Sequence, residues 1–208
     1  PPPRRTRRTA PVPTVPASLP LYWHVSENFG DRLAPGLVRR ITGVEPTYAS
    51  PDPPSVPFLV TGSILGWSIR RGIVWGAGAA FESDLDPLQL SPPSETFRIV
   101  APRGPLSAAR VRAAGHAPVT YGDPGLLLPR FYAPEIQCTA RVGVLSSWVG
   151  HMQAQALLGG RFPVVSTLNT VEVGPDVIRS WGVVVTDALH GLVAAIAYSK
   201  PMVWTTFS

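Results

Sequence analysis

A histidine and a glycine late in the 208-residue chain have the residue types and spacing for chemistry on an anion. His190 and Gly191 follow the run Gly182–Val185, which predicts a buried strand, and they begin segment 188–200, which predicts a helix ending before Pro201. Ligands bind outside the carboxyl ends of parallel strands, and a helix N-terminus there presents free N–H groups to an anion. The alternative is that His190 is a hydrogen-bonded histidine at a domain edge.

Two charged residues are candidates for the same site. Arg103 lies between a predicted strand and a predicted helix, where its guanidinium could hold a carboxylate or a phosphate through paired hydrogen bonds. A surface salt bridge is the alternative for Arg103. Asp31 follows the first predicted strand and could orient a hydroxyl group of a substrate, although its position favours an N-cap for the next helix.

Small residues end several of the predicted strands. Gly62 and Ser63 end one strand, and Gly76 and Gly78 end the next one. Such residues let a ligand or another segment approach the backbone closely, and ordinary tight turns are the alternative. Asp123, in the sequence Gly-Asp-Pro-Gly, is expected to shape a turn.

Strands and helices alternate along the chain, which predicts parallel sheets. We place a Pro/Arg-rich disordered arm at 1–17, a first domain at 18–135 and a second, shorter domain at 136–208, with the boundary in the irregular stretch 126–139. The predicted strands are 19–25, 47–49, 58–64, 72–78, 97–101, 117–121, 141–146, 162–167, 182–185 and 202–205, and the predicted helices are 31–41, 103–115, 149–158, 174–181 and 188–200.

Composition excludes some classes of function. The net charge of +5 comes mostly from four arginines in the arm, so the rest of the chain lacks the basic surface of a nucleic-acid binder. Cys138 is the single cysteine, which excludes an intrachain disulfide and a cysteine zinc cluster. The histidines other than His190 have no metal-ligand spacing, so no metal is expected.

The sequence shows no secretory signal and no clear membrane span. Residues 1–20 lack an apolar h-region, and the apolar stretch 181–204 is interrupted by Asp187, His190 and Lys200. We therefore expect a cytoplasmic protein, and peripheral contact with the inner face of a membrane stays open.

Seven segments of the sequence form a combined pattern that covers nearly everything after Leu19. The segments are Asn28–Ile41, Gly62–Ile64, Val74–Gly78, Arg103–Ser107, Tyr121–Pro129, Arg141–Trp148 and Thr186–Pro201. Together they resemble the polysaccharide pyruvyltransferase family, in the family's order. The resemblance implies two Rossmann-like domains around a cleft, as in GT-B glycosyltransferases. It also implies transfer of pyruvate from phosphoenolpyruvate to a sugar as a ketal, during synthesis of a bacterial surface glycan.

The resemblance also implies roles for particular residues. Catalysis is expected from His190, Arg103 and Asp31, with phosphoenolpyruvate as donor substrate, no cofactor and a glycan or lipid-linked sugar as acceptor. His190 is expected to be either the general acid and base or a hydrogen-bond donor to phosphate. The family often has an arginine where this chain has Ala188, so Arg103, or less favourably Arg161 or Arg179, is expected to supply the cation. The substrate-binding residues are expected to be Asn28, Gly30, Gly62, Ser63, Gly76, Gly78, Asp123 and Gly191.

Three other functions remain in competition. The first is a sugar-nucleotide-dependent glycosyltransferase of similar architecture. The second is an inactive or truncated homologue that serves as a binding module, which Ala188 and the short second domain favour. The third and most distant is nucleic-acid binding, which rests only on the arginines of the arm. The sequence leaves the oligomeric state open.

Overall fold

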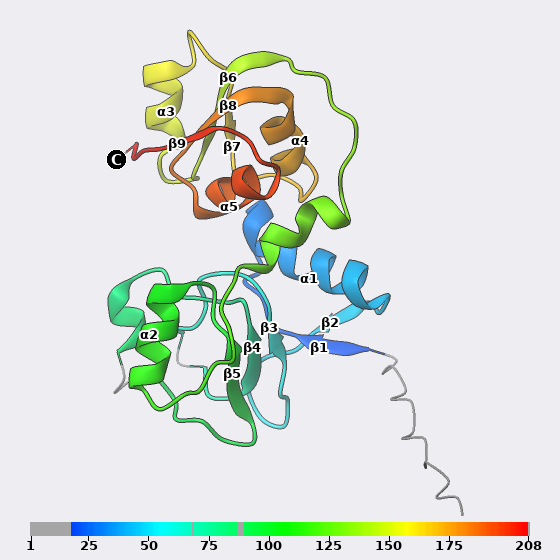
Figure 1. The fold of residues 1–208 in the computed structure, drawn as a ribbon, viewed down its shortest axis with the longest axis vertical. Helices are drawn as coiled ribbons and strands as arrows, with labels where there is room; N and C mark the ends of the chain where they lie inside the picture. The colour runs from blue at the N-terminus through cyan, green and yellow to red at the C-terminus, as the bar shows by residue number, and fades with distance from the viewer. Residues whose placement is uncertain (1–17, 68, 87–89, 208) are drawn as a thin grey trace, which may run out of the picture.

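A computed structural model describes residues 18–67, 69–86 and 90–207, so the predicted arm at 1–17 lies outside the described residues. The described chain forms two sheets, one with the strand order β2-β1-β3-β4-β5 and one with the order β7-β6-β8-β9 (Figure 1). All the strand pairings in both sheets are parallel. The expected α/β class with two parallel sheets is therefore confirmed.

The first sheet and its helices come from the N-terminal half of the chain. Its strands are β1 (Leu19–Leu21), β2 (Pro46–Tyr48), β3 (Phe58–Leu59), β4 (Gly72–Trp75) and β5 (Phe97–Ala101). Its helices are α1 (Phe29–Thr42), α2 (Pro105–Ala113) and the short 3₁₀ helix η1 (Glu82–Leu85).

The second sheet comes from the C-terminal half, after the 3₁₀ helix η2 (Pro124–Arg130). Its strands are β6 (Ala140–Ser146), β7 (Val164–Ser166), β8 (Trp181–Thr186) and β9 (Met202–Trp204). Its helices are α3 (His151–Leu158), α4 (Val173–Ser180) and α5 (Leu189–Ala197). No helix in the described ranges is long and apolar enough to cross a bilayer.

Local sequence accounts for the ends of α1. Asn28 is the N-cap of α1, because its side chain accepts a hydrogen bond from the N–H of Gly30. At the other end, Gly43 has a φ of 72° and donates its N–H to the Arg39 carbonyl at 2.9 Å, as predicted for a glycine that ends a helix.

One predicted strand is absent from the structure, and several others are shorter than predicted. The strand expected at 19–25 ends at Leu21, the one at 72–78 ends at Trp75, and the one at 162–167 covers only Val164–Ser166. The strand expected at 117–121 is absent, because Pro118 has no N–H to donate and only the Val119 N–H bonds to the neighbouring strand, at the Val100 carbonyl. The strand expected at 58–64 stops at Leu59, and the chain then turns at Gly62, whose φ is 98°.

One hydrophobic core belongs to the first sheet alone. We call it the first-sheet core. Its buried residues all lie between Leu59 and Val111, and Phe97 and Leu59 are its largest fully buried members on the strands. It therefore forms from residues close together in the sequence.

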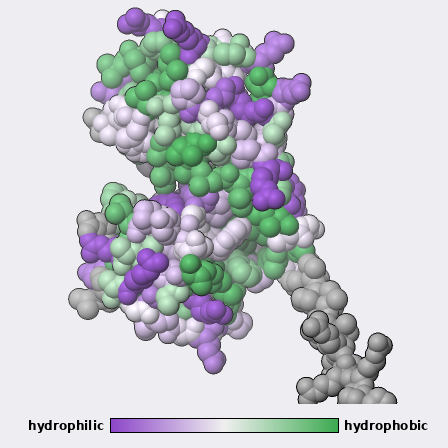
Figure 2. All heavy atoms as spheres, in the orientation of Figure 1, coloured by the Kyte–Doolittle hydropathy of each residue, from purple (hydrophilic) through white to green (hydrophobic). Residues whose placement is uncertain are grey.

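A second core, which we call the shared core, joins the two halves of the molecule. Phe29, Leu33 and Leu37 lie four residues apart on one stripe of α1 and pack with residues of η2, β6, β8, α4 and α5. The next stripe of α1, Ala34 and Val38, packs against the first sheet. Figure 1 shows α1 and η2 lying between the sheets, and Figure 2 shows apolar residues gathered at the waist. The division into two domains stays a prediction, because α1 packs with both halves.

Candidate functional site

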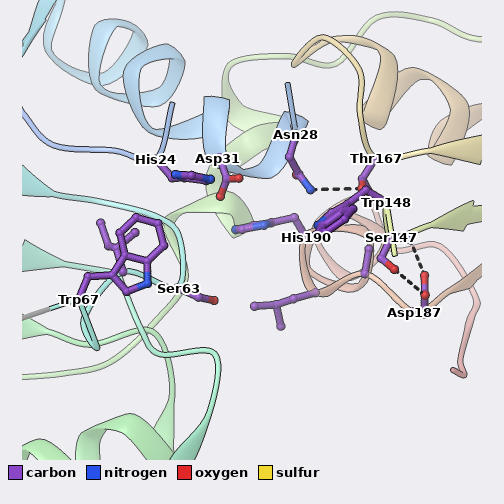
Figure 3. A pocket seen from close by; sticks show the side chains of 13 residues that line it. His24, Asn28, Asp31, Ser63, Trp67, Ser147, Trp148, Thr167, Asp187 and His190 are labelled. Atoms are coloured by element: carbon purple, nitrogen blue, oxygen red, sulfur yellow. Dashed lines mark hydrogen bonds between the residues drawn. The ribbon is translucent and has the colours of Figure 1, made fainter. Parts of the chain in front are cut away.

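A pocket of ≈ 240 Å³ lies where the two sheets face each other (Figure 3). Each residue that lines it follows the carboxyl end of β1, β3, β6, β7 or β8, which is the edge where parallel sheets bind ligands. The lining consists of His24, Asn28, Asp31, Ser63, Ile64, Trp67, Ser147, Trp148, Thr167, Asp187, Ala188, Leu189 and His190.

His190 lies at this pocket, in the first turn of α5, as predicted. Its ring packs edge-on against Phe29 at 6.4 Å, and it lies so close to α1 that a Cβ on Gly30 would be 2.0 Å from Nδ1. Its Nε2 is buried and has no hydrogen-bond partner. The alternative of a hydrogen-bonded histidine therefore does not hold at Nε2. A buried polar atom that makes no hydrogen bond destabilises the fold.

The electrostatic surroundings of His190 favour the neutral imidazole. Burial is the largest cause and lowers the pKa of His190; the Arg103 charge lowers it further, whereas Asp123 and Asp31 oppose the shift. These three charged residues are the ones that the sequence singled out, so the structure brings them into electrostatic range of the histidine.

Arg103 borders the pocket through Ser63. Its guanidinium donates one hydrogen bond to Ser63 Oγ at 3.0 Å and another to the Ala79 carbonyl at 2.6 Å. Burial lowers the pKa of Arg103, with Asp123 opposing the shift. The salt bridge left open by the sequence is absent, since the described residues pair Arg103 with no carboxylate within 4.0 Å. A partly buried guanidinium without a paired anion is suited to binding one.

Asp31 and Asn28 come from the first turn of α1 and the residue before it. The N-cap role favoured for Asp31 was wrong, because Asn28 caps the helix. Asp31 instead lines the pocket, and its Oδ2 accepts a hydrogen bond from Ser26 Oγ at 2.7 Å. Asn28 Nδ2 donates to Thr167 Oγ1 at 3.2 Å, which ties the start of α1 to the loop after β7. The helix that carries Asp31 is therefore fixed to the second half.

Asp123 shapes a turn, as predicted, and also holds an unmatched acceptor. Its Oδ1 accepts the Gly125 N–H at 2.8 Å, whereas its Oδ2 is buried without a partner. Thr61 Oγ1 is another buried atom without a partner. Neither residue is part of the pocket wall.

The glycines predicted to bind substrate serve packing instead of lining the pocket. A Cβ at Gly76 would lie 2.1 Å from Pro124, one at Gly78 2.8 Å from Arg103, and one at Gly191 2.4 Å from Thr186. Gly30 likewise makes room for the His190 ring. Of the predicted residues only Asn28, Asp31, Ser63 and His190 line the pocket; the others, Gly30, Gly62, Gly76, Gly78, Arg103, Asp123 and Gly191, do not.

The other candidate cations lie elsewhere. Arg179 packs over the Tyr198 ring at 5.4 Å, and Arg161 lies over Phe162 at 6.0 Å. Neither lines the pocket. Arg103 is therefore the nearest of the three predicted cations to the pocket wall.

Sequence reasoning missed most of the pocket lining. Trp67, Trp148 and Asp187 line it, as do His24, Ser147 and Thr167. Their signal was their position, since each follows the carboxyl end of a parallel strand. In the sequence Asp187 stood out only as a charge within the apolar stretch 181–204, but both of its oxygens accept from Ser147, one from the N–H and one from Oγ at 2.7 Å.

Comparisons with known proteins add no relative. No family model, curated protein or solved structure matches the chain. Within the described part of the chain, no group of three or more His, Cys, Asp or Glu residues is placed to hold a metal ion. Function therefore has to be argued from the pocket itself.

Proposed function

We propose that the chain is a phosphoenolpyruvate-dependent pyruvyltransferase of GT-B-like architecture, in line with its sequence resemblance. One observation carries the proposal: the unpartnered, buried Nε2 of His190 lies at a pocket bordered by Arg103, a partly buried guanidinium without a carboxylate partner among the described residues. These groups can serve a proton transfer beside an anion, which pyruvyl transfer requires.

The reaction assigns a task to each group. C3 of phosphoenolpyruvate gains a proton, one sugar hydroxyl adds to C2, phosphate leaves, and a second hydroxyl then adds to C2 to complete the ketal. The two hydroxyls lose two protons, which balance the proton gained at C3 and the one that leaves with phosphate. His190 is the general acid and base, and its neutral form at neutral pH can take a hydroxyl proton. Asp31 orients the hydroxyl, and Arg103 holds the donor's charge.

Binding and turnover together test this proposal. Calorimetry should show that phosphoenolpyruvate binds the native chain and that Arg103→Ala weakens binding about tenfold or more, since a charge-assisted hydrogen bond contributes roughly 1.5–3 kcal/mol. His190→Ala should lower single-turnover phosphate release in the presence of acceptor glycans while changing affinity less. Unchanged binding in the first variant together with unchanged turnover in the second would remove the assignment.

A binding module without turnover is the second candidate. Ala188 lines the pocket at the position where the family often has an arginine, and none of the thirteen lining residues of the described chain is a lysine or an arginine. Glycan binding without phosphate release from phosphoenolpyruvate would favour this candidate. Nucleotide release from a sugar nucleotide would instead favour a glycosyltransferase.

A further inference from the structure

Two tryptophans that the pyruvyl transfer does not use form walls of the pocket. Trp67 follows β3 of the first sheet and is 46% exposed, and Trp148 follows β6 of the second sheet and is 64% exposed. Figure 3 shows them on the two sides of His190. Large aromatic rings exposed in a pocket offer apolar faces at little cost in side-chain entropy.

Contacts within the chain hold the ring of Trp67 and the backbone next to Trp148. The Trp67 ring meets His24 edge-to-face at 5.0 Å. Trp148 follows Ser147, whose N–H and Oγ both donate to Asp187, and Ser147 Oγ in turn accepts the Gly150 N–H at 3.0 Å. Such contacts reduce the freedom that these residues lose on binding, which favours affinity.

Two acidic side chains oppose a negatively charged acceptor. Arg103 holds the donor's charge next to Ser63, whereas Asp31 and Asp187 are the charged side chains of the described lining, which contains no lysine or arginine. Asp31 Oδ2 accepts from Ser26, which leaves Oδ1 to accept a hydrogen bond from a ligand hydroxyl. The pocket of ≈ 240 Å³ is also below the usual range of roughly 300–1,000 Å³ for drug-sized ligands, so an acceptor glycan places only its terminal ring there, beside the small donor.

We propose that Trp67 and Trp148 bind the sugar acceptor, an inference that rests on the proposed function. The acceptor unit is a neutral terminal pyranose rather than a uronic acid or a phosphorylated sugar. The C–H face of the ring packs on the tryptophans, and a hydroxyl group donates to Asp31. Asp187 is a positioning residue that holds the loop carrying Trp148.

The test compares matched sugars and matched tryptophans. The probes are methyl glycosides of galactose, glucose and mannose, each paired with its uronic acid, and binding is followed by saturation-transfer NMR on the native chain and its variants. At least one neutral glycoside should bind at least tenfold more tightly than its uronate. Trp148→Ala should weaken that binding tenfold or more, and Trp67→Ala should weaken it too, with Trp67→Phe restoring part of the loss.

Trp204→Ala is the matched control, because Trp204 on β9 is 51% exposed and lies outside the pocket. It should leave glycoside binding within twofold of the native value. Equal losses in Trp148→Ala and Trp204→Ala, equal affinity for a neutral sugar and its uronate, or no binding of any neutral glycoside would overturn the inference.

Phosphoenolpyruvate binding, measured on the same variants, separates this inference from the proposed function. Trp148→Ala should keep native affinity for phosphoenolpyruvate. Tryptophan-dependent glycoside binding without phosphoenolpyruvate binding would leave the sugar site standing and remove the pyruvyltransferase proposal. If the chain turns over phosphoenolpyruvate but both tryptophan variants bind glycosides with native affinity, the sugar-site proposal alone is wrong.

Discussion

The first-sheet core and the shared core are built from different distances along the chain. The first-sheet core draws on residues between Leu59 and Val111, whereas the shared core joins Phe29 on α1 to Ala195 on α5. Both contain fully buried aromatic side chains, Phe97 in the first and Phe29 in the second. The two phenylalanines contact different histidines. Phe29 contacts the ring of His190, which lines the pocket, whereas Phe97 contacts the ring of His116, which does not.

This difference teaches that stability and ligand binding are coupled in one core and separate in the other. The pocket lies at the junction of the sheets, so its geometry depends on the packing of α1 against the second half. Substitutions in the shared core should therefore affect folding and binding together.

Phe29→Ala should have the largest effect. Removing a fully buried phenylalanine typically costs about 3–5 kcal/mol of unfolding free energy, and here it also removes the side chain against which His190 packs. Denaturant unfolding and calorimetry with phosphoenolpyruvate should show loss of both stability and affinity.

Phe97→Ala is the comparison for Phe29→Ala. It should cost a similar amount, about 3–5 kcal/mol, because Phe97 is only 1% exposed in the first-sheet core. Affinity for phosphoenolpyruvate, scaled to the folded fraction, should stay within about twofold of native. An equal loss of affinity in both variants would show that the two cores are not functionally distinct.

Gly30→Ala should have an intermediate effect on stability and a large one on turnover. The added Cβ would lie 2.0 Å from Nδ1 and 2.3 Å from Cγ of His190, so the imidazole has to move. We expect a loss of about 1–3 kcal/mol, as for other overpacked sites. Single-turnover phosphate release should fall about tenfold or more.

Gly36→Ala on the same helix is the control for Gly30→Ala. Its Cβ would meet only the flexible end of Arg40, 3.3 Å away, and alanine favours a helix over glycine by about 1 kcal/mol. Stability should rise slightly and turnover should stay native. A turnover loss in Gly36→Ala as large as in Gly30→Ala would contradict the role given to the His190 contact.

The pH dependence of stability should give the smallest effect. Burial lowers the pKa of His190 in the folded chain, so below the unfolded value of about 6.5 the unfolded chain binds a proton that the folded chain does not. The contribution of His190 is therefore fully present above about pH 6.5 and declines as the pH falls toward the lower folded value. Thermal melts should show a shallower acid decline for His190→Gln than for the native chain, and identical slopes would contradict the shift.

Much of the fold could be predicted from the sequence, because β-branched runs and helix-ending glycines indicate strands and helix ends directly. The β-branched runs placed β5 and β8, and Gly43 placed the end of α1. The strand expected at 117–121 failed because alternating apolar residues say nothing of whether a neighbour's backbone is free to pair. Predicting the shared core would have required long-range packing, which periodicity does not record.

The site was predicted in part for the same reason. His190 was found because a strand, a helix start and a histidine lie together in sequence, and Asp31 because it follows a strand. The glycines were misread, since a glycine that makes room for Pro124 or Arg103 has the same sequence signal as one that makes room for a ligand. Trp67 and Trp148 lie on opposite sides of the predicted boundary segment 126–139 in the sequence, so only folding brings them to one pocket.

The position of α1 between the two sheets also has a consequence for how the chain is made. A ribosome releases α1 long before Ile178 and the other C-terminal partners of its apolar stripe exist. At about 5–20 residues per second, that stripe waits roughly 7–30 s in water or against a chaperone. The same helix that later joins the two halves thus presents an unpaired apolar surface on the nascent chain.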